Sequence, residues 1–226
     1  QGVDSIEVDS HRLSLYQAWI DQTFDHGRAS LRLGAYDVSG EFGVLNSAAD
    51  LIGPSFGMAP ELAGGGPAGV AAYPSTALAA RAAFKPSKAT YVQAALVNAT
   101  PGSLGERGGV DCKFRDGALA IAEAGWTGRG TVALGAWAFT DRMGDQRALT
   151  PAGDAVRRRA WGAYLMVEQP LGERATAFLR AGASDADTQP LAGSWQAGLR
   201  VQPVFGGRED SVVAVGVSQA RLASGY

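Results

Sequence analysis

Apolar and polar residues alternate with a period of two along most of the chain. Between residues 16 and 24 the even positions include Tyr16, Ile20 and Phe24, whereas the odd positions include Trp19 and Asp21. This pattern predicts a β-strand with one apolar and one polar face. Ten such stretches of roughly ten residues follow one another: 12–24, 29–37, 76–85, 89–98, 117–126, 131–141, 160–169, 175–184, 192–202 and 211–223.

One stretch, residues 38–75, interrupts the alternation and is called the long segment below. It is rich in apolar residues and glycine, and its only charged residues are Glu41, Asp50 and Glu61. Connections longer than about 15 residues without regular structure are uncommon in compact domains and usually functional. Because the long segment is too apolar to extend into water, we expect it to pack against another surface.

The length of the strands and the character of their two faces predict an all-β transmembrane, antiparallel up-and-down barrel. About 9–11 residues let a tilted strand cross a bilayer. One face mixes charged and amide residues with alanine and glycine, as a wet lumen does, and short turns alternate with longer loops, including a charged loop predicted over 141–159. The larger apolar face carries aromatic residues near strand ends: Tyr16, Phe24, Phe84, Trp126, Phe139 and Trp161.

The stretch 117–126 departs from this pattern, because Leu119 and Ile121 share their parity with Glu123. Two explanations are open. Either a bulge intervenes, or some apolar residues face the lumen.

Charge and composition narrow the function. A net charge of −2 and a pI near 5.7 argue against nucleic-acid binding. Two histidines, His11 and His26, and the single Cys112 provide no metal-ligand cluster. The motif G-x-G-x-x-G at 64–69 has no strand before it and no helical pattern after it, so it does not indicate a dinucleotide site. We expect no cofactor, no metal and no enzymatic activity.

Eight stretches in order carry a combined family signal: LYQAWIDQTF (15–24), LRLGAYDVSGEF (31–42), GPSFGMAPEL (53–62), YPSTALAARAAFKP (73–86), YVQAALVNATPG (91–102), GALAIAEAGW (117–126), ALGAWAFT (133–140) and GAYLMVEQ (162–169). They resemble the carbohydrate-selective porin family, OprB. The resemblance implies a sixteen-stranded barrel in the outer membrane of a Gram-negative bacterium, through which sugars diffuse passively. It also implies that the long segment folds back into the pore as its constriction. Two other functions stay open, namely an outer-membrane barrel enzyme and a surface β-structured binding module.

Ten strands are fewer than sixteen, so we interpret residues 1–226 as a single porin barrel domain that is incomplete at both ends, with 38–75 as the pore-constricting loop. The expected partners are small carbohydrates such as glucose and outer-membrane lipid. The sequence leaves a monomer and a homotrimer equally open.

Two arginines, Arg32 and Arg81, lie symmetrically about the long segment and should be close cross-strand neighbours on the lumen face. A hairpin that turns at His26 and Gly27 places Asp21 nearly opposite Arg32. The guanidinium groups either donate hydrogen bonds to sugar hydroxyls, or they only form ion pairs that shape the wall.

Four further residues complete the predicted pore lining near the arginines. Trp19 and Tyr36 could stack on the C–H face of a sugar ring. Glu61 either accepts hydrogen bonds from sugar at the constriction or anchors the long segment to the arginines. Phe56 is interpreted as a packing residue of the long segment rather than as a sugar platform.

Three charged residues share the parity of the lumen face: Glu123, Glu168 and Arg180. Glu123 is included in the predicted pore lining. All three are interpreted as solvated residues of the wall.

Overall fold

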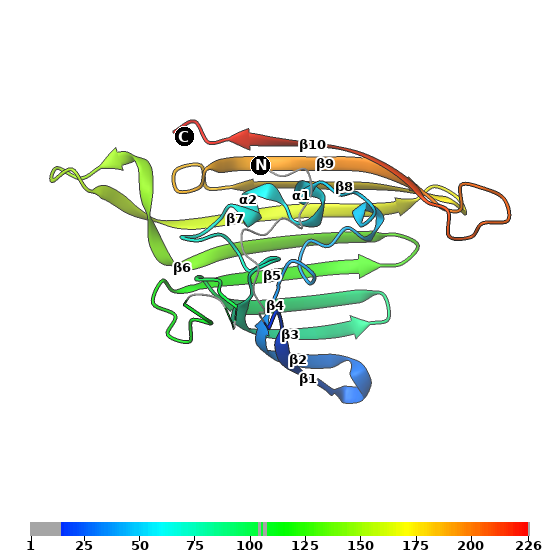
Figure 1. The fold of residues 1–226 in the computed structure, drawn as a ribbon, viewed down its shortest axis with the longest axis horizontal. Helices are drawn as coiled ribbons and strands as arrows, with labels where there is room; N and C mark the ends of the chain where they lie inside the picture. Colours follow the sequence, from blue (N-terminus) through cyan, green and yellow to red (C-terminus); the bar gives the residue numbers. More distant parts are fainter. Residues whose placement is uncertain (1–14, 104, 106–107, 226) are drawn as a thin grey trace.

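The computed structural model describes residues 15–103, 105 and 108–225, which form one antiparallel sheet of ten strands. Strands adjacent in sequence are adjacent in the sheet, so the topology is up-and-down throughout (Figure 1). The strands are β1 (Ala18–Phe24), β2 (Ala29–Tyr36), β3 (Ala77–Ser87), β4 (Thr90–Asn98), β5 (Ala118–Thr127), β6 (Thr131–Leu149), β7 (Ala155–Pro170), β8 (Ala175–Ser184), β9 (Leu191–Val201) and β10 (Val213–Leu222). The prediction of an all-β protein with ten strands is confirmed; residues 12–14 of the first predicted strand, and His11, lie outside the described residues.

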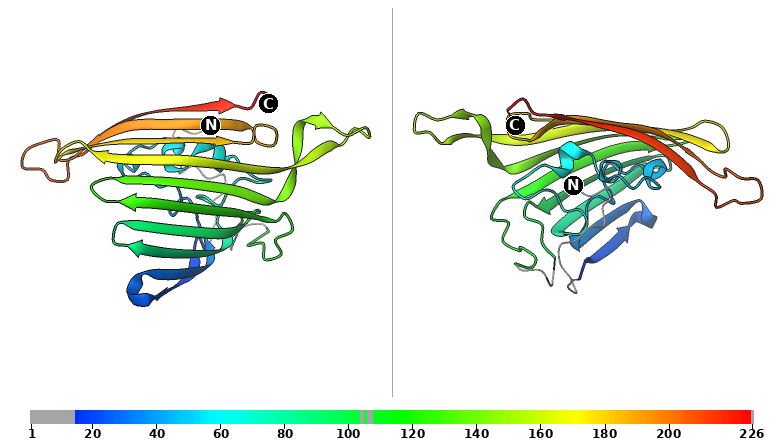
Figure 2. Two further views of the ribbon diagram at one scale, coloured as in Figure 1. Left: turned by 180° about the vertical axis from the view of Figure 1, so that it is seen from behind. Right: turned by 45° about the horizontal axis from the view of Figure 1, so that its top comes forward.

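The sheet is curved but not closed. In the described part of the chain β1 pairs only with β2, and β10 pairs only with β9. The two views in Figure 2 show the sheet as an open, twisted wall. Four of its connections, those after β2, β4, β6 and β8, lie at one end, which we call the long-loop end.

One face of the sheet, the outer face, is apolar and uncovered. Ile20 is 76% exposed, Leu134 is 62% exposed and Val215 is 68% exposed. Trp126 and Trp161 are also exposed on this face. Soluble monomers rarely expose a continuous apolar surface of this extent, whereas a bilayer would cover it.

The other face, the inner face, is covered by the long segment, which lies across the sheet in both views (Figures 1 and 2). Strands bound this segment at Tyr36 and Ala77, and a hydrogen bond of 3.1 Å from the Val38 N–H to the Ala71 carbonyl joins its two arms. It contains a turn of 3-10 helix, η2 (Asn46–Ala48), and two single-turn helices, α1 (Pro54–Gly57) and α2 (Pro60–Ala63). A further turn, η1 (Asp25–Gly27), connects β1 to β2. Among the described residues no helix has the length and apolar character needed to span a bilayer.

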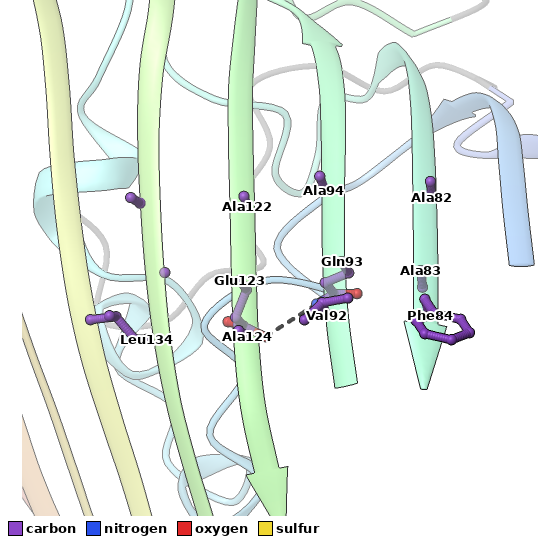
Figure 3. Close-up of a pocket in the computed structure, with 12 residues that line it drawn as sticks. Ala82, Ala83, Phe84, Val92, Gln93, Ala94, Ala122, Glu123, Ala124 and Leu134 are labelled. Atoms are coloured by element: carbon purple, nitrogen blue, oxygen red, sulfur yellow. Dashed lines mark hydrogen bonds between the residues drawn. The ribbon is translucent and has the colours of Figure 1, made fainter. Parts of the chain in front are cut away.

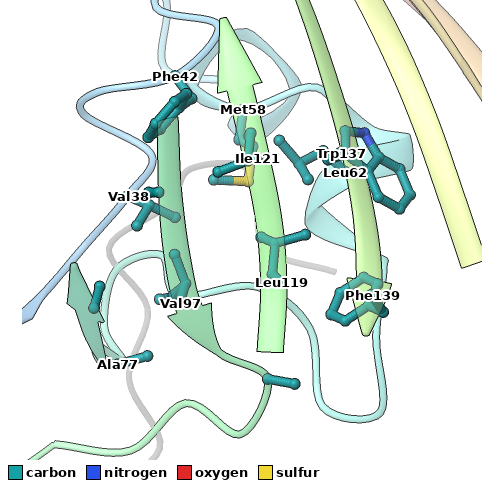
Figure 4. Packing of buried hydrophobic residues seen from close by; sticks show 14 of the residues in the cluster. Val38, Phe42, Met58, Leu62, Ala77, Val97, Leu119, Ile121, Trp137 and Phe139 are labelled. Atoms are coloured by element: carbon teal, nitrogen blue, oxygen red, sulfur yellow. The ribbon is translucent and has the colours of Figure 1, made fainter. Parts of the chain in front are cut away.

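Apolar residues of the long segment and of the inner face form the main buried cluster. Figure 4 shows Phe42, Met58 and Leu62 of the segment packed against Ile121 and Trp137 of the sheet. β5 pairs with β4 and β6 without a register shift, so no bulge explains the parity of Leu119 and Ile121. These residues face inward because the long segment, and not water, covers them.

Two aromatic residues expected on the apolar outer face lie elsewhere. Phe139 is opposite Leu119 on the inner face and is 1% exposed, and the backbone of Gly66 packs so closely on its ring that a Cβ would come within 2.6 Å of it. Tyr16 precedes β1; its hydroxyl donates a hydrogen bond of 2.8 Å to Asp37 Oδ2, just before the long segment, and its ring packs edge-on against Tyr73 of the segment with 5.4 Å between centroids. In both cases the segment provides a partner that strand parity alone does not reveal.

The charged loop predicted over 141–159 is mostly strand. β6 continues to Leu149 and β7 begins at Ala155, so only a short turn separates them. The extended hairpin projects beyond the rest of the sheet at the long-loop end (Figures 1 and 2). The register shifts between Ala138 and Arg142, where the hairpin leaves the plane of the sheet.

Candidate functional site

The cross-strand register brings the predicted charged residues together on the inner face of β1, β2 and β3. Asp21 is directly opposite Arg32, and Arg32 is directly opposite Arg81. Asp21 Oδ2 lies 2.8 Å from Arg32 Nε and 3.0 Å from Arg81 Nη2. The predicted geometry of these three residues is confirmed, and two like charges can face each other because a carboxylate lies between them.

The second carboxylate of this cluster, Glu41, comes from the long segment. Glu41 Oε1 lies 2.6 Å from Arg32 Nη1 and 3.3 Å from Arg81 Nη2. Sequence reasoning assigned no role to Glu41, and for Glu61 it left open either contact with sugar or anchoring of the long segment to the arginines. The available signal was the scarcity of charge in the long segment, since each buried charge there needs a partner.

Aromatic rings flank the Arg32 guanidinium. Its Cζ lies 4.0 Å from the centroid of a Trp19 ring and 5.7 Å from that of Tyr36, distances at which cation–π attraction acts. Trp19 is 44% exposed, whereas Tyr36 is buried. The cluster therefore presents an accessible aromatic edge beside a fixed cation.

Several polar atoms of the cluster are buried without a hydrogen-bond partner among the described residues. They are Asp21 Oδ1, Glu41 Oε2 and Arg81 Nε. Arg81 Nη1 donates a hydrogen bond to Ser30 Oγ. Buried polar atoms normally find partners, and these two acceptors and one donor, which are enclosed by protein, have none among the described side chains.

Glu123 was predicted to be a solvated residue of the wall. The structure shows instead that it anchors the long segment. It is 4% exposed, and Glu123 Oε2 accepts hydrogen bonds of 2.7 Å from the Gly43 N–H and 2.7 Å from the Tyr164 hydroxyl. Glu123 Oε1 accepts bonds of 2.8 Å from the Tyr91 hydroxyl and 3.1 Å from Gln93 Nε2, the latter drawn in Figure 3. A carboxylate with four donors is stable in this buried position, and it fixes the backbone of the segment at Gly43.

Arg180 and Glu168, which were also interpreted as solvated, bind the long segment in the same manner. Arg180 is fully buried; its Nη1 donates a bond of 2.6 Å to the Gly43 carbonyl, and its Nη2 donates one of 2.7 Å to the Ser55 carbonyl. Glu168 Oε1 accepts a bond of 2.6 Å from the Ser47 N–H. The long segment has no strand pairing that would satisfy its backbone N–H and C=O groups. Charged side chains of the sheet provide these hydrogen bonds instead.

Glu61 and Phe56 also dock the segment, but on β8 and β9. Glu61 is 1% exposed and accepts a hydrogen bond from the Ser194 hydroxyl, so it reaches neither Arg32 nor Arg81. Burial raises the pKa of Glu61, although Ser194 and the nearby charge of Arg180 oppose the rise. Phe56 is half-buried and packs edge-on against Phe178 with 6.3 Å between ring centroids, as its interpretation as a packing residue requires.

Glycines on the inner face leave room for the aromatic rings of the residues opposite them, beneath the long segment. A Cβ at Gly135 would come within 2.1 Å of the Tyr164 ring. We expect Gly135→Val to displace Tyr164 from Glu123 and to cost about 1–3 kcal/mol, the usual cost of overpacking. The midpoint of urea unfolding in detergent would measure the loss.

The matched control for this substitution is Ala136→Val, one residue away. Ala136 lies on the outer face and is exposed, so the added methyl groups meet no packed neighbour. Figure 3 shows the row of small residues, with Ala82, Ala94 and Ala122, that continues across this face. Equal losses in both variants would contradict the proposed contact between Gly135 and Tyr164.

The two carboxylates of the cluster, Asp21 and Glu41, are bound to arginines. In the described part of the chain no three or more histidine, cysteine, aspartate or glutamate side chains are placed to hold an ion together. The arrangement instead combines guanidinium donors, carboxylate acceptors and an accessible indole ring. These are groups that bind hydroxylated, uncharged molecules by hydrogen bonds and stacking.

Comparisons with known proteins agree with this architecture. The family model described as carbohydrate-selective porin, OprB family, matches residues 1–226. The high-pH structure of Pseudomonas putida OprB is similar with a TM-score of 0.81 at 18% sequence identity, over 99% of this chain and 58% of that chain. The low-pH structure of the same protein gives a TM-score of 0.51 at 16% identity, over 91% of this chain and 52% of that one. No curated protein sequence matches significantly.

Identities this low show the fold alone, and the fold is that of an antiparallel β-barrel. The chain spans just over half the length of the two solved structures that it resembles. A partial match of this kind agrees with a sheet that is curved and has two unpaired edges.

Proposed function

Because the chain belongs to the carbohydrate-selective porin family, OprB, we propose that its ten strands form part of the wall of an outer-membrane sugar channel. Further strands would pair with β1 and β10 and remove the two free edges, whose backbone N–H and C=O groups find no hydrogen-bond partner in lipid. The uncovered apolar face would contact lipid, and the inner face would surround the pore. Neutral sugars such as glucose would then pass down their concentration gradient.

In this proposal the long segment narrows the pore. It is held on the inner face by Glu123, Glu168 and Arg180, and it contributes Glu41 to the cluster around Arg32 and Arg81. A segment fixed at several separate points can set a constant pore width. We infer that its removal, for example by deleting residues 62–70, would widen the channel.

The observation that carries the proposal is the cluster of Arg32, Arg81, Asp21 and Glu41 beside the exposed Trp19. Guanidinium groups that are oriented by carboxylates present their remaining N–H donors in a fixed plane. Sugar hydroxyls can both donate to and accept from this set, while the indole ring supports the apolar face of the sugar. Each contact is modest, so the sugar can leave again, as conduction requires.

Replacing Arg81 with alanine should weaken sugar block of the ion current by about 1–3 kcal/mol, the scale for hydrogen bonds to charged groups. It should also shift ion preference toward cations, because Asp21 and Glu41 then exceed the remaining positive charge. Bilayer recordings of the complete protein, with glucose titrated onto each variant, measure both quantities.

Arg81→Lys separates charge from geometry. Lysine keeps the positive charge but lacks the planar fork, so ion preference should persist while sugar block falls. Full recovery of sugar block by lysine would show that guanidinium geometry is irrelevant and that Arg81 only forms ion pairs.

A further inference from the structure

A second polar cavity lies at the long-loop end of the inner face, away from the cluster of Arg32 and Arg81. Its volume is about 350 Å³, within the range of small-molecule sites. Several separate parts of the chain border it: the hairpin of β6 and β7, the connection before β5, the tip of the long segment and the connection after β8. The lining residues that matter here are Arg142, Arg157, Asp116, Asp141, Thr188 and Gly66.

The side chains of the two arginines that line this cavity, Arg142 and Arg157, are exposed. Among the described residues, the side chains of Arg142 and Arg157 form no hydrogen bond and no ion pair. Arg158, on the opposite face of the hairpin, is instead neutralised by Asp145 at 2.6 Å. Arg142 is moreover directly opposite Arg159, and like charges in directly opposite positions destabilise a strand pair.

The cavity repeats the chemistry of the first cluster, with two guanidinium groups and two carboxylates. In the first cluster these groups bind one another at 2.6–3.3 Å. Here no ion pair joins the arginines to Asp116 or Asp141 among the described residues; Asp116 Oδ2 accepts only the Thr100 hydroxyl, at 2.7 Å. Donors and acceptors are therefore free to bind a ligand.

We propose that this cavity is an entry site for a neutral saccharide at the mouth of the channel. The four charged side chains that line the cavity, two positive and two negative, offer hydrogen-bond donors and acceptors side by side, as a polyol requires. The N–H groups of Arg142 and Arg157 would donate to sugar hydroxyls, and Asp116 and Asp141 would accept from them. The inference rests on the proposed function, because it places this site on the path toward Arg32 and Arg81.

Direct binding to the complete, detergent-solubilised protein tests the proposal without relying on transport. Saturation-transfer NMR with glucose would be recorded in a background that carries Arg32→Ala and Arg81→Ala, so that the first cluster no longer contributes. We expect a glucose signal to remain in this background. Adding Arg142→Ala and Arg157→Ala should then reduce that signal at least threefold.

Arg159→Ala provides the matched control, because Arg159 belongs to the same hairpin, forms no ion pair among the described residues and does not line the cavity. This variant should keep the glucose signal. An unchanged signal after Arg142→Ala and Arg157→Ala, or an equal loss in Arg159→Ala, would overturn the proposal. So would a response to glucose 6-phosphate without one to glucose, which would identify an anion site.

The proposed function fails by a different result. If glucose neither blocks the ion current of the unaltered protein nor crosses liposomes that contain it, the protein is not a sugar channel, whatever the mouth cavity binds. If glucose does block the current but the NMR signal disappears with Arg32→Ala and Arg81→Ala alone, only the entry site is wrong.

Discussion

Replacing Arg180 with alanine is expected to detach the long segment from the inner face and to raise single-channel conductance. The side chain is fully buried and donates hydrogen bonds to the carbonyls of Gly43, Ser55 and Phe56, as well as to Gln196. A hydrogen bond to a charged group contributes about 1.5–3 kcal/mol, and buried acceptors that lose their donor add a desolvation cost. The docked position of the segment should therefore lose at least about 3 kcal/mol.

Two measurements follow this change in the complete protein. Amide hydrogen exchange between residues 43 and 58 should accelerate by roughly two orders of magnitude, since about 1.4 kcal/mol corresponds to a factor of ten. Single-channel conductance should increase because the segment no longer holds a fixed place in the lumen. Slow exchange together with unchanged conductance would show that other contacts hold the segment without Arg180.

Arg200→Ala is the control for this experiment. Arg200 also lies on the inner face and also reaches the long segment, with its Nε 2.6 Å from Asp50 Oδ2. Both side chains are partly exposed, so the pair should contribute less than about 1 kcal/mol. The contrast isolates the effect of burial from the loss of an arginine.

The second large effect concerns the outer face. Val217 is 54% exposed there, whereas the adjacent Ser218 lies on the inner face opposite Gln196. We expect Val217→Arg to destabilise the protein in lipid vesicles by about 2–4 kcal/mol, the cost of arginine near the middle of a bilayer. Ser218→Arg should cost at most about 1 kcal/mol, mainly through the lost bond between Ser218 and Ser55 hydroxyls.

Because the two residues are neighbours in β10, they lie at nearly the same depth, and only the face differs. Urea unfolding from vesicles measures both losses. Comparable costs would mean that the outer face does not contact lipid. If Val217→Arg lowered the free energy of unfolding in detergent-free buffer but not in vesicles, that result would also contradict contact between the outer face and lipid.

The sequence by itself determined the number and order of the strands and the face of most of their residues, although not the extension of β6 and β7 beyond the sheet or the inward position of Phe139. Alternation has a period of two in any strand, so the positions of Ile20 and Leu134 on one face and of Asp21 and Arg81 on the other follow from counting. The register across the turn at His26 also follows, because a short hairpin fixes which residues are opposite. The pair of Asp21 and Arg32 was predictable for that reason.

Only the tertiary structure decided what the inner face contacts. Parity states that Glu123, Glu168 and Arg180 face inward, but it does not state whether they meet water or protein. The path of the long segment decides this, and it depends on contacts between residues far apart in the chain, such as Gly43 with Glu123 and Ser55 with Arg180. The segment has no periodic pattern from which its path could be predicted. The contacts of Glu41 with the two arginines and of Glu61 with Ser194 are therefore known only from the tertiary structure.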